Sequence, residues 1–270
     1  MMQKTLLAIS VTLFWLLPNI SGAESVISTG MHPFPSSISL DKCFAEALLD
    51  AKKSAMSKSG LEGITSSSME VCVETSSIAN CELHQETLSY FDGGYISSFS
   101  VLNKSETASG GQRECIIEIK ADVQRYSQLP DPKFALSASL KGKRTKVKGD
   151  EIVVEGETNQ KTNLFLMAWY PNVSDDKYYK LAPNDFEKFE NVSGKFAIPS
   201  LEGQSQYGFY AEPDTNLDEN VQFEVLILLA TKRPFDLLEI ENSASLYQRL
   251  NSLGRDNWQM IKMSYNVLKN

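Results

Sequence analysis

The stretch 114–123, ECIIEIKADV, decides the fold of the first half of this chain. Every second side chain in it is apolar or small, which is typical of a β-strand with one buried face. That face carries Cys115, Ile117, Ile119, Ala121 and Val123. We expect it to pack against a helix.

The helix expected to cover this strand lies between Asp41, which can cap its start, and Ser59-Gly60, which can end it. Apolar side chains recur at helical spacing in between. They are Phe44, Ala47, Leu48, Ala51, Ala55 and Met56. With further strands expected at 68–75 and 95–102, residues 41–126 are predicted to form an α+β domain of one helix on a small antiparallel sheet.

The first 23 residues have the features of a secretory signal peptide. Lys4 supplies a positive charge, and an almost unbroken apolar run follows at 6–17. This run is shorter than the roughly 20 apolar residues that a membrane-spanning helix needs. We therefore expect cleavage between Ala23 and Glu24, and export to the periplasm.

The four cysteines, Cys43, Cys72, Cys81 and Cys115, all lie in the first half of the chain. An even number of cysteines in an exported chain indicates disulfide bonds. Cys43 lies on the buried stripe of the expected helix and Cys115 on the buried face of the strand, whereas Cys72 faces away from that core. We therefore predict the bonds Cys43–Cys115 and Cys72–Cys81. Because no cysteine lies at the cleavage point, we expect no lipid anchor.

The formal net charge of −8 argues against a general nucleic-acid-binding protein, which needs a basic face to neutralise phosphates. No segment after the leader is long and apolar enough to span a membrane. The most apolar one, at 225–230, has the length of a strand.

The second half of the chain is predicted to form a separate β-rich domain. We expect an extended lead-in at 24–40, a linker at 127–133 and a β-sandwich with a short C-terminal helix at 134–270. Its predicted elements include strands at 152–158 and 164–170 separated by a turn at Asn159-Gln160. Further elements are expected at 178–181, 195–198, 206–211, 222–231 and 258–268, with the helix at 243–253.

Three segments of the first half resemble the N-terminal domain of flagellar assembly protein T and a related family of envelope lipoproteins. They are "AEALLDAKKSAMSKSGLEGITSSSMEV", "SYFDGGYISSFSVLNKSE" and "ECIIEIKADVQ". The four cysteines and the missing lipid-attachment cysteine depart from that pattern. The resemblance implies a protein of the cell envelope.

The second half resembles a β-rich bacterial family, domain of unknown function 4384, in four segments. They are "VVEGETNQKTNLFLMAWYP", "YYKLAPND", "GKFAIPS" and "FEVLILLATKRPFD". This resemblance implies a periplasmic sandwich module that occurs beside envelope and secretion components, without a defined activity.

Catalytic signatures are weak, and we predict no catalytic residue. The sequence has only two histidines, His32 and His84. His84 follows Cys81 at a spacing seen in metal sites, but zinc needs further ligands that oxidised cysteines cannot supply. We therefore predict no metal site there and no cofactor.

One acidic loop places Asp214, Asn216 and Asp218 at alternate positions, as in calcium-binding loops. The EF-hand pattern fails, because Glu219 stands where glycine is required and Val225 where glutamate is required. A solvated turn explains the loop more simply, and a weak Ca²⁺ site is the alternative.

Two groups of residues are candidates for contact with a partner protein. Lys143, Arg144 and Lys146 form a basic cluster that either docks an acidic partner or lipid headgroups, or protects an edge strand from pairing. Tyr170 and Tyr178 are expected to face outward, because successive side chains alternate in a strand and Trp169 and Tyr179 would then face the core.

We therefore expect a non-catalytic periplasmic assembly or accessory factor of a flagellum, a pilus or a secretion system. Its expected partners are envelope or surface-machine proteins, through which it would associate with the outer membrane. The alternatives are a hydrolase of envelope polymers and a module that binds Ca²⁺ or a small ligand.

Overall fold

The computed structural model describes most of the chain after the leader. The described residues are 23–36, 38–61, 70–75, 78–83, 90–91, 93–109, 112–170, 177–216, 220–237, 240 and 243–269. For those between 70 and 91, and for 109, 112, 243 and 244, only the backbone is described. The predicted signal peptide, up to residue 22, lies outside the described residues. No helix in the described part is long and apolar enough to cross a membrane.

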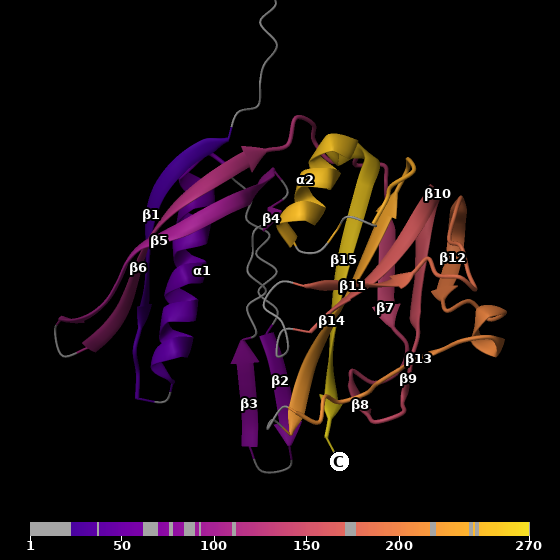
Figure 1. Cartoon of the computed structure of the whole chain (residues 1–270), viewed down its shortest axis with the longest axis horizontal. Helices are drawn as coiled ribbons and strands as arrows, with labels where there is room; N and C mark the ends of the chain where they lie inside the picture. Colours follow the sequence, from indigo (N-terminus) through magenta and orange to yellow (C-terminus); the bar gives the residue numbers. More distant parts are fainter. Residues whose placement is uncertain are drawn as a thin grey trace, which may run out of the picture.

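The first half forms one helix on a four-stranded antiparallel sheet, which is the predicted arrangement (Figure 1). The strand expected at 68–75 is not part of this sheet, because it pairs in a separate hairpin. The strand order is β1-β6-β5-β4. The elements are β1 (Glu24–Pro33), α1 (Leu40–Lys58), β4 (Tyr90–Phe91), β5 (Gly94–Ser109) and β6 (Gln112–Arg125).

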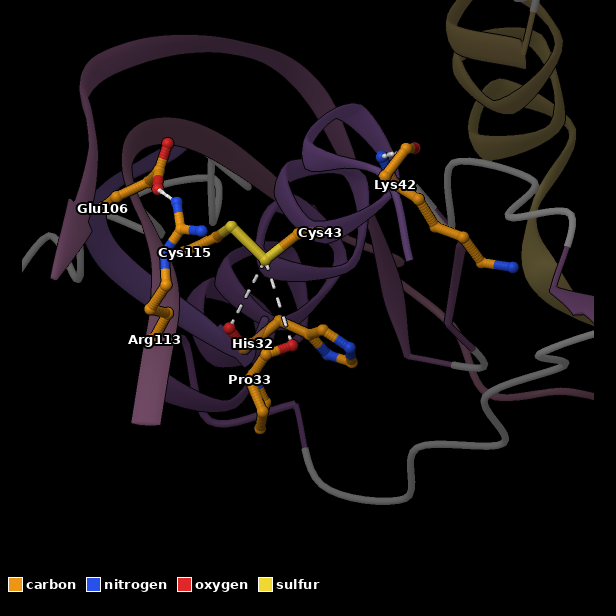
Figure 2. Close-up of a disulfide and its surroundings, with 8 residues drawn as sticks. His32, Pro33, Lys42, Cys43, Glu106, Arg113 and Cys115 are labelled. Atoms are coloured by element: carbon orange, nitrogen blue, oxygen red, sulfur yellow. Dashed lines mark hydrogen bonds and ion pairs between the residues drawn. A yellow bond between two sulfur atoms is a disulfide. The ribbon is translucent and has the colours of Figure 1, made fainter. Parts of the chain in front are cut away.

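The alternating face of β6 packs against α1. Its five small or apolar side chains, from Cys115 to Val123, are at most 4% exposed. Cys43 on α1 and Cys115 on β6 form a disulfide bond, with their Cα atoms 5.9 Å apart, as the facing of the two elements predicts (Figure 2). Sγ of Cys43 lies 3.6 Å from the carbonyl oxygen of His32 on β1. The bond therefore joins the helix to the sheet beside its edge strand.

Two expectations for this region need correction. The predicted lead-in is part of the domain, because β1 pairs with β6 along its whole length, from Glu24 opposite Val123 onward. The helix is capped by Ser39, whose side chain accepts a hydrogen bond from the backbone N–H of Lys42 at 3.2 Å. Asp41 lies in the first turn instead, where a negative charge favours the helix dipole.

A short hairpin contains the other two cysteines. It consists of β2 (Glu70–Thr75) and β3 (Ile78–Leu83), and Cys72 is the register partner of Cys81. The backbone thus sets these residues opposite one another. The sulfur atoms lie outside the described part of the chain, so the Cys72–Cys81 bond stays a prediction.

The second half is built around a curled seven-stranded sheet (Figure 1). Its strands are β7 (Leu136–Leu140), β8 (Thr145–Val147), β10 (Val154–Trp169), β11 (Tyr178–Ala182), β12 (Val192–Ile198), β14 (Val221–Thr231) and β15 (Trp258–Leu268). The smaller elements are β9 (Glu151–Ile152), β13 (Phe209–Tyr210), α2 (Ser243–Leu253) and the 3₁₀ turns η1 (Gly203–Ser205) and η2 (Arg255–Asn257).

Strand β10 produces the curl, because its two ends have different neighbours. The part before Asn159 pairs with β7 and β12, and the part after Thr162 pairs with β11 and β14. The prediction of a turn at Asn159-Gln160 is therefore wrong. The chain continues as one strand, and the Asn159 side chain donates to Lys133 O and accepts from Ala135 N at the bend.

Strand β14 is buried on both faces. One face, including Val225, Ile227 and Leu229, packs under α2 and against the first half of the chain. The other face, including Leu226 and Leu228, lines the inside of the curled sheet. The continuous apolar run in the sequence is the result of this double coverage.

The two halves of the chain share a hydrophobic core through aromatic rings. The rings of Tyr95 and Tyr126 stack at 5.7 Å between centroids, and the ring of Tyr95 lies 6.1 Å from that of Tyr247 on α2. Tyr126 also meets Trp258 of β15 edge to face at 5.8 Å. The predicted linker at 127–133 therefore joins two units that pack against each other.

The helix and β1 approach so closely at Gly30 that no side chain fits. A Cβ atom on Gly30 would lie 2.1 Å from both the carbonyl oxygen of Ala47 and the backbone nitrogen of Ala51. Ser28, two residues earlier, donates a hydrogen bond of 2.7 Å to the carbonyl oxygen of Ala51. This contact brings α1 down onto the edge of the sheet.

We therefore expect Gly30→Ala to lower the free energy of unfolding by about 2 kcal/mol or more, because the helix backbone must move to admit one methyl group. Thr29→Ala is the matched control, since the Thr29 side chain is exposed on the opposite face. Urea unfolding followed by circular dichroism measures both. Equal stability of the two variants would contradict the close approach.

Candidate functional site

A cavity of about 440 Å³ opens on the inner face of the curled sheet. Its floor comes from β14 and β15, and its walls come from β9, β11, β13 and the residues that follow β10 and β13. The lining residues are Ile152, Tyr170, Tyr179, Leu181, Gly208, Phe209, Tyr210, Glu212, Asp214, Gln222, Glu224, Leu226 and Tyr265. This volume lies within the range of small-ligand sites.

Glu224 and Tyr265 form the polar floor of the cavity. The two residues are register partners on β14 and β15, so the pairing of these strands sets their side chains next to each other. The Tyr265 hydroxyl donates a short hydrogen bond to Oε2 of Glu224. Glu224 is only 6% exposed, in a strand whose side chains are mostly apolar.

Burial changes the protonation of this pair. Loss of hydration raises the pKa of Glu224 to about 7, and the hydrogen bond from Tyr265 offsets part of that rise. The pKa of Tyr265 is raised as well, by burial and by the neighbouring Glu224 carboxylate. Burial also raises the pKa of Tyr170 to about 12, with smaller contributions from Glu224 and Tyr179. Both tyrosines therefore keep their protons at neutral pH, while Glu224 titrates near it.

Two more carboxylates lie at the cavity, and each has a local partner. Glu212 forms an exposed ion pair of 2.7 Å with Lys148. Oδ1 of Asp214 accepts hydrogen bonds of 2.9 Å from the backbone and the side chain of Asn216. The buried Gln222 side chain holds the backbone of Asp214 through both its oxygen and its nitrogen. The loop after β13 is thus attached to β14.

Of the three residues of the weak calcium alternative, Asp214 and Asn216 lie within the described part of the chain. The Asp214 carboxylate stabilises the turn through Asn216, and Asp218 lies outside the described residues. No group of three or more His, Cys, Asp or Glu residues in the described part of the chain is arranged to hold a metal ion. His84, the other weak metal candidate, also lies outside the described residues.

The two tyrosines predicted to contact a partner have different positions. Tyr178 is 6% exposed and belongs to the core on the α2 side of the sheet, beside its register partner Trp169. Its expected outward orientation is therefore wrong, because the face of the sheet that it occupies is covered by the core on the α2 side. Tyr170 is half-buried and lines the cavity, where its ring lies 5.3 Å from that of Tyr179.

The basic cluster lies on and beside β8, at the edge of the seven-stranded sheet. Lys143 and Arg144 are exposed. Lys146 is 6% exposed, and its ammonium group donates to the carbonyl oxygens of Lys141 and Glu151 at 3.3 and 3.0 Å. Lys146 therefore has a structural role, and the position of β8 agrees with the edge-strand interpretation of this cluster.

Sequence reasoning missed Glu224 as a site residue. A signal was present, because a single glutamate in the run FEVLILLA is unusual for a doubly buried strand. Its partner Tyr265 was not predictable, since the pairing depends on the register of β14 and β15. Phe209 and Tyr210 line the cavity, and their place there likewise depends on tertiary structure.

Comparison of the chain with protein-family models gives no match, and comparison with curated proteins gives none either. The two family resemblances drawn from the sequence therefore stay predictions. The cavity combines a buried carboxyl group that binds a proton near neutral pH, several aromatic rings and enough space for a small ligand.

We expect Glu224→Gln to raise the free energy of unfolding at about pH 8 by about 2 kcal/mol and to change it little at about pH 4. The native carboxyl has a pKa near 7, above its ordinary value of 4.5, so the folded state binds the proton more tightly than the unfolded state. The free energy of unfolding of the wild type therefore falls as the pH rises from 4.5 to about 7. The uncharged amide of the variant does not ionise, so its stability does not fall in this range, and its oxygen still accepts the hydrogen bond from Tyr265.

Urea unfolding at the two pH values measures the difference. Glu190→Gln, at an exposed position, is the matched control and should change stability at neither pH. An equal effect of Glu224→Gln at both pH values would contradict the burial of this charge.

Proposed function

We propose that the chain is an exported, non-catalytic protein of the periplasm that supports a cell-envelope machine by binding another protein. A flagellum, a pilus or a secretion system is the kind of machine that the sequence resemblances favour. Export is supported by the leader at 1–23 and by the Cys43–Cys115 bond, since disulfides persist in oxidising compartments.

An exposed apolar row on β5 carries the binding proposal. Phe99, Val101 and Leu102 are 41%, 48% and 50% exposed. Strand β4 pairs only with the first two residues of β5, and no other described strand pairs with this side of β5. An open edge with apolar side chains is a surface to which a partner can add a strand.

The opposite edge of this sheet is protected. Lys58 of α1 donates to the carbonyl oxygen of Ile27 at 3.0 Å, and Asp50 accepts from the backbone N–H of Met31 at 3.1 Å. These helix side chains occupy hydrogen-bonding groups of β1 that a further strand would need. The difference between the two edges favours β5 as the docking edge.

Site-specific photo-crosslinking in intact envelopes tests the proposal. A benzophenone amino acid at position 101 is expected to give a covalent adduct with a discrete partner protein. Position 201 is the matched control, because Leu201 is an exposed apolar residue (82%) on the other half of the chain. Absence of an adduct at position 101, or an identical set of adducts at both positions, would refute docking at β5.

Mass spectrometry of the native protein tests export separately. We expect a chain that begins at Glu24 and contains no reactive thiols, since both predicted cysteine pairs would be oxidised. Alkylation without prior reduction should then leave all four cysteines unmodified, and alkylation after reduction should modify all four. An intact leader together with free thiols would argue against the periplasmic assignment.

A further inference from the structure

The cavity beside Glu224 has an excess of negative charge. Three carboxylates line it, and no lysine or arginine is among its described lining residues. Lys148 neutralises Glu212, but it does so at the exposed rim. The buried Glu224 receives only the neutral hydroxyl of Tyr265, so its charge has no cationic partner among the described residues that line the cavity.

The surroundings of Glu224 give it little compensation from any side. Tyr265 faces it from β15. Tyr170, directly after β10, and Tyr179, on β11, lie on the walls. Glu212 and Asp214, on the loop after β13, add negative charge. Because a desolvated carboxylate is costly without a counter-charge, a cation that enters the cavity gains the attraction that the protein itself does not supply.

The walls suit an organic cation better than a bare metal ion. The rings of Tyr170 and Tyr179, with Phe209 and Tyr210, offer aromatic faces, which attract ammonium groups. Tyr179 already shows this property, because Nζ of Lys177 lies 5.2 Å from the centre of its ring. Ile152, Leu181 and Leu226 add apolar surface that an alkyl chain can cover.

We propose that this cavity binds a primary ammonium group on an alkyl chain, with Glu224 as the counter-charge and the tyrosine rings as walls. A lysine side chain of a protein partner and a free aliphatic diamine both carry this group. The proposal deepens the proposed function, on which it rests, by naming the chemistry that a partner would present at a second site. A neutral sugar fits less well, because it would leave the buried charge uncompensated.

Titration calorimetry with the full mature chain tests the proposal. The probes are N-acetyl-lysine methylamide, its neutral Nε-acetylated form, cadaverine and N-acetylglucosamine. At about pH 8 the charged lysine probe should bind at least about tenfold more tightly than the acetylated form. Binding should weaken at about pH 5.5, where Glu224 is protonated while the amine keeps its charge.

Glu224→Gln should weaken binding of the lysine probe by about tenfold, and Glu190→Gln should leave it unchanged. Tyr179→Leu should also weaken binding, which tests the aromatic wall without a change of charge. Tighter binding of the lysine probe than of cadaverine would identify a protein side chain as the source, and the reverse order would identify a free diamine. Either order supports recognition of an ammonium group.

Equal affinity for the charged and acetylated probes in the wild type would overturn the proposal, whatever the variants do. Preferred binding of N-acetylglucosamine would overturn it as well. Failure here is distinguishable from failure of the proposed function, because the adduct expected at position 101 arises on the other half of the chain. If that adduct forms while the wild type binds the charged and acetylated probes equally or binds neither, only the ammonium site is refuted.

Discussion

The coverage of β14 on both faces is the constraint on which the rest of the structure depends. Its alternating side chains enter two cores, one beneath α2 and one inside the curled sheet. A strand of this kind needs apolar cover on each side, so the first half of the chain has to contribute Tyr95 and Tyr126 to the α2 side. The bend in β10 supplies the cover on the other side.

The apolar cover on the inner face of β14 is interrupted at the cavity. Glu224 belongs to the same face as Leu226 and Leu228, yet it directs a carboxylate to the floor of an open space. Replacing an apolar side chain by a buried acid costs stability. The protein keeps this unfavourable acid in a cavity that has aromatic walls and an excess of negative charge. This is the physical reason to regard the cavity as a binding site.

The local patterns of the sequence were sufficient for elements with a strong period. The alternation in β6, the stripe of α1 and the bounds of α2 follow from them. The turn predicted at Asn159-Gln160 failed because its polar side chains bond to Lys133 and Ala135, far away in sequence, and so stabilise a bend within one strand. The outward orientation predicted for Tyr178 was wrong, because alternation gives the face of a side chain but not whether other elements cover that face.

By itself the sequence determined the helix-on-sheet unit and the Cys43–Cys115 pairing, since both depend on which face each residue occupies within its own element. It also determined that the remainder is rich in strands. Tertiary structure alone decided the curl of the sheet, the joining of the two halves and the meeting of Glu224 with Tyr265. These features depend on strand register and long-range packing, which local periodicity does not encode.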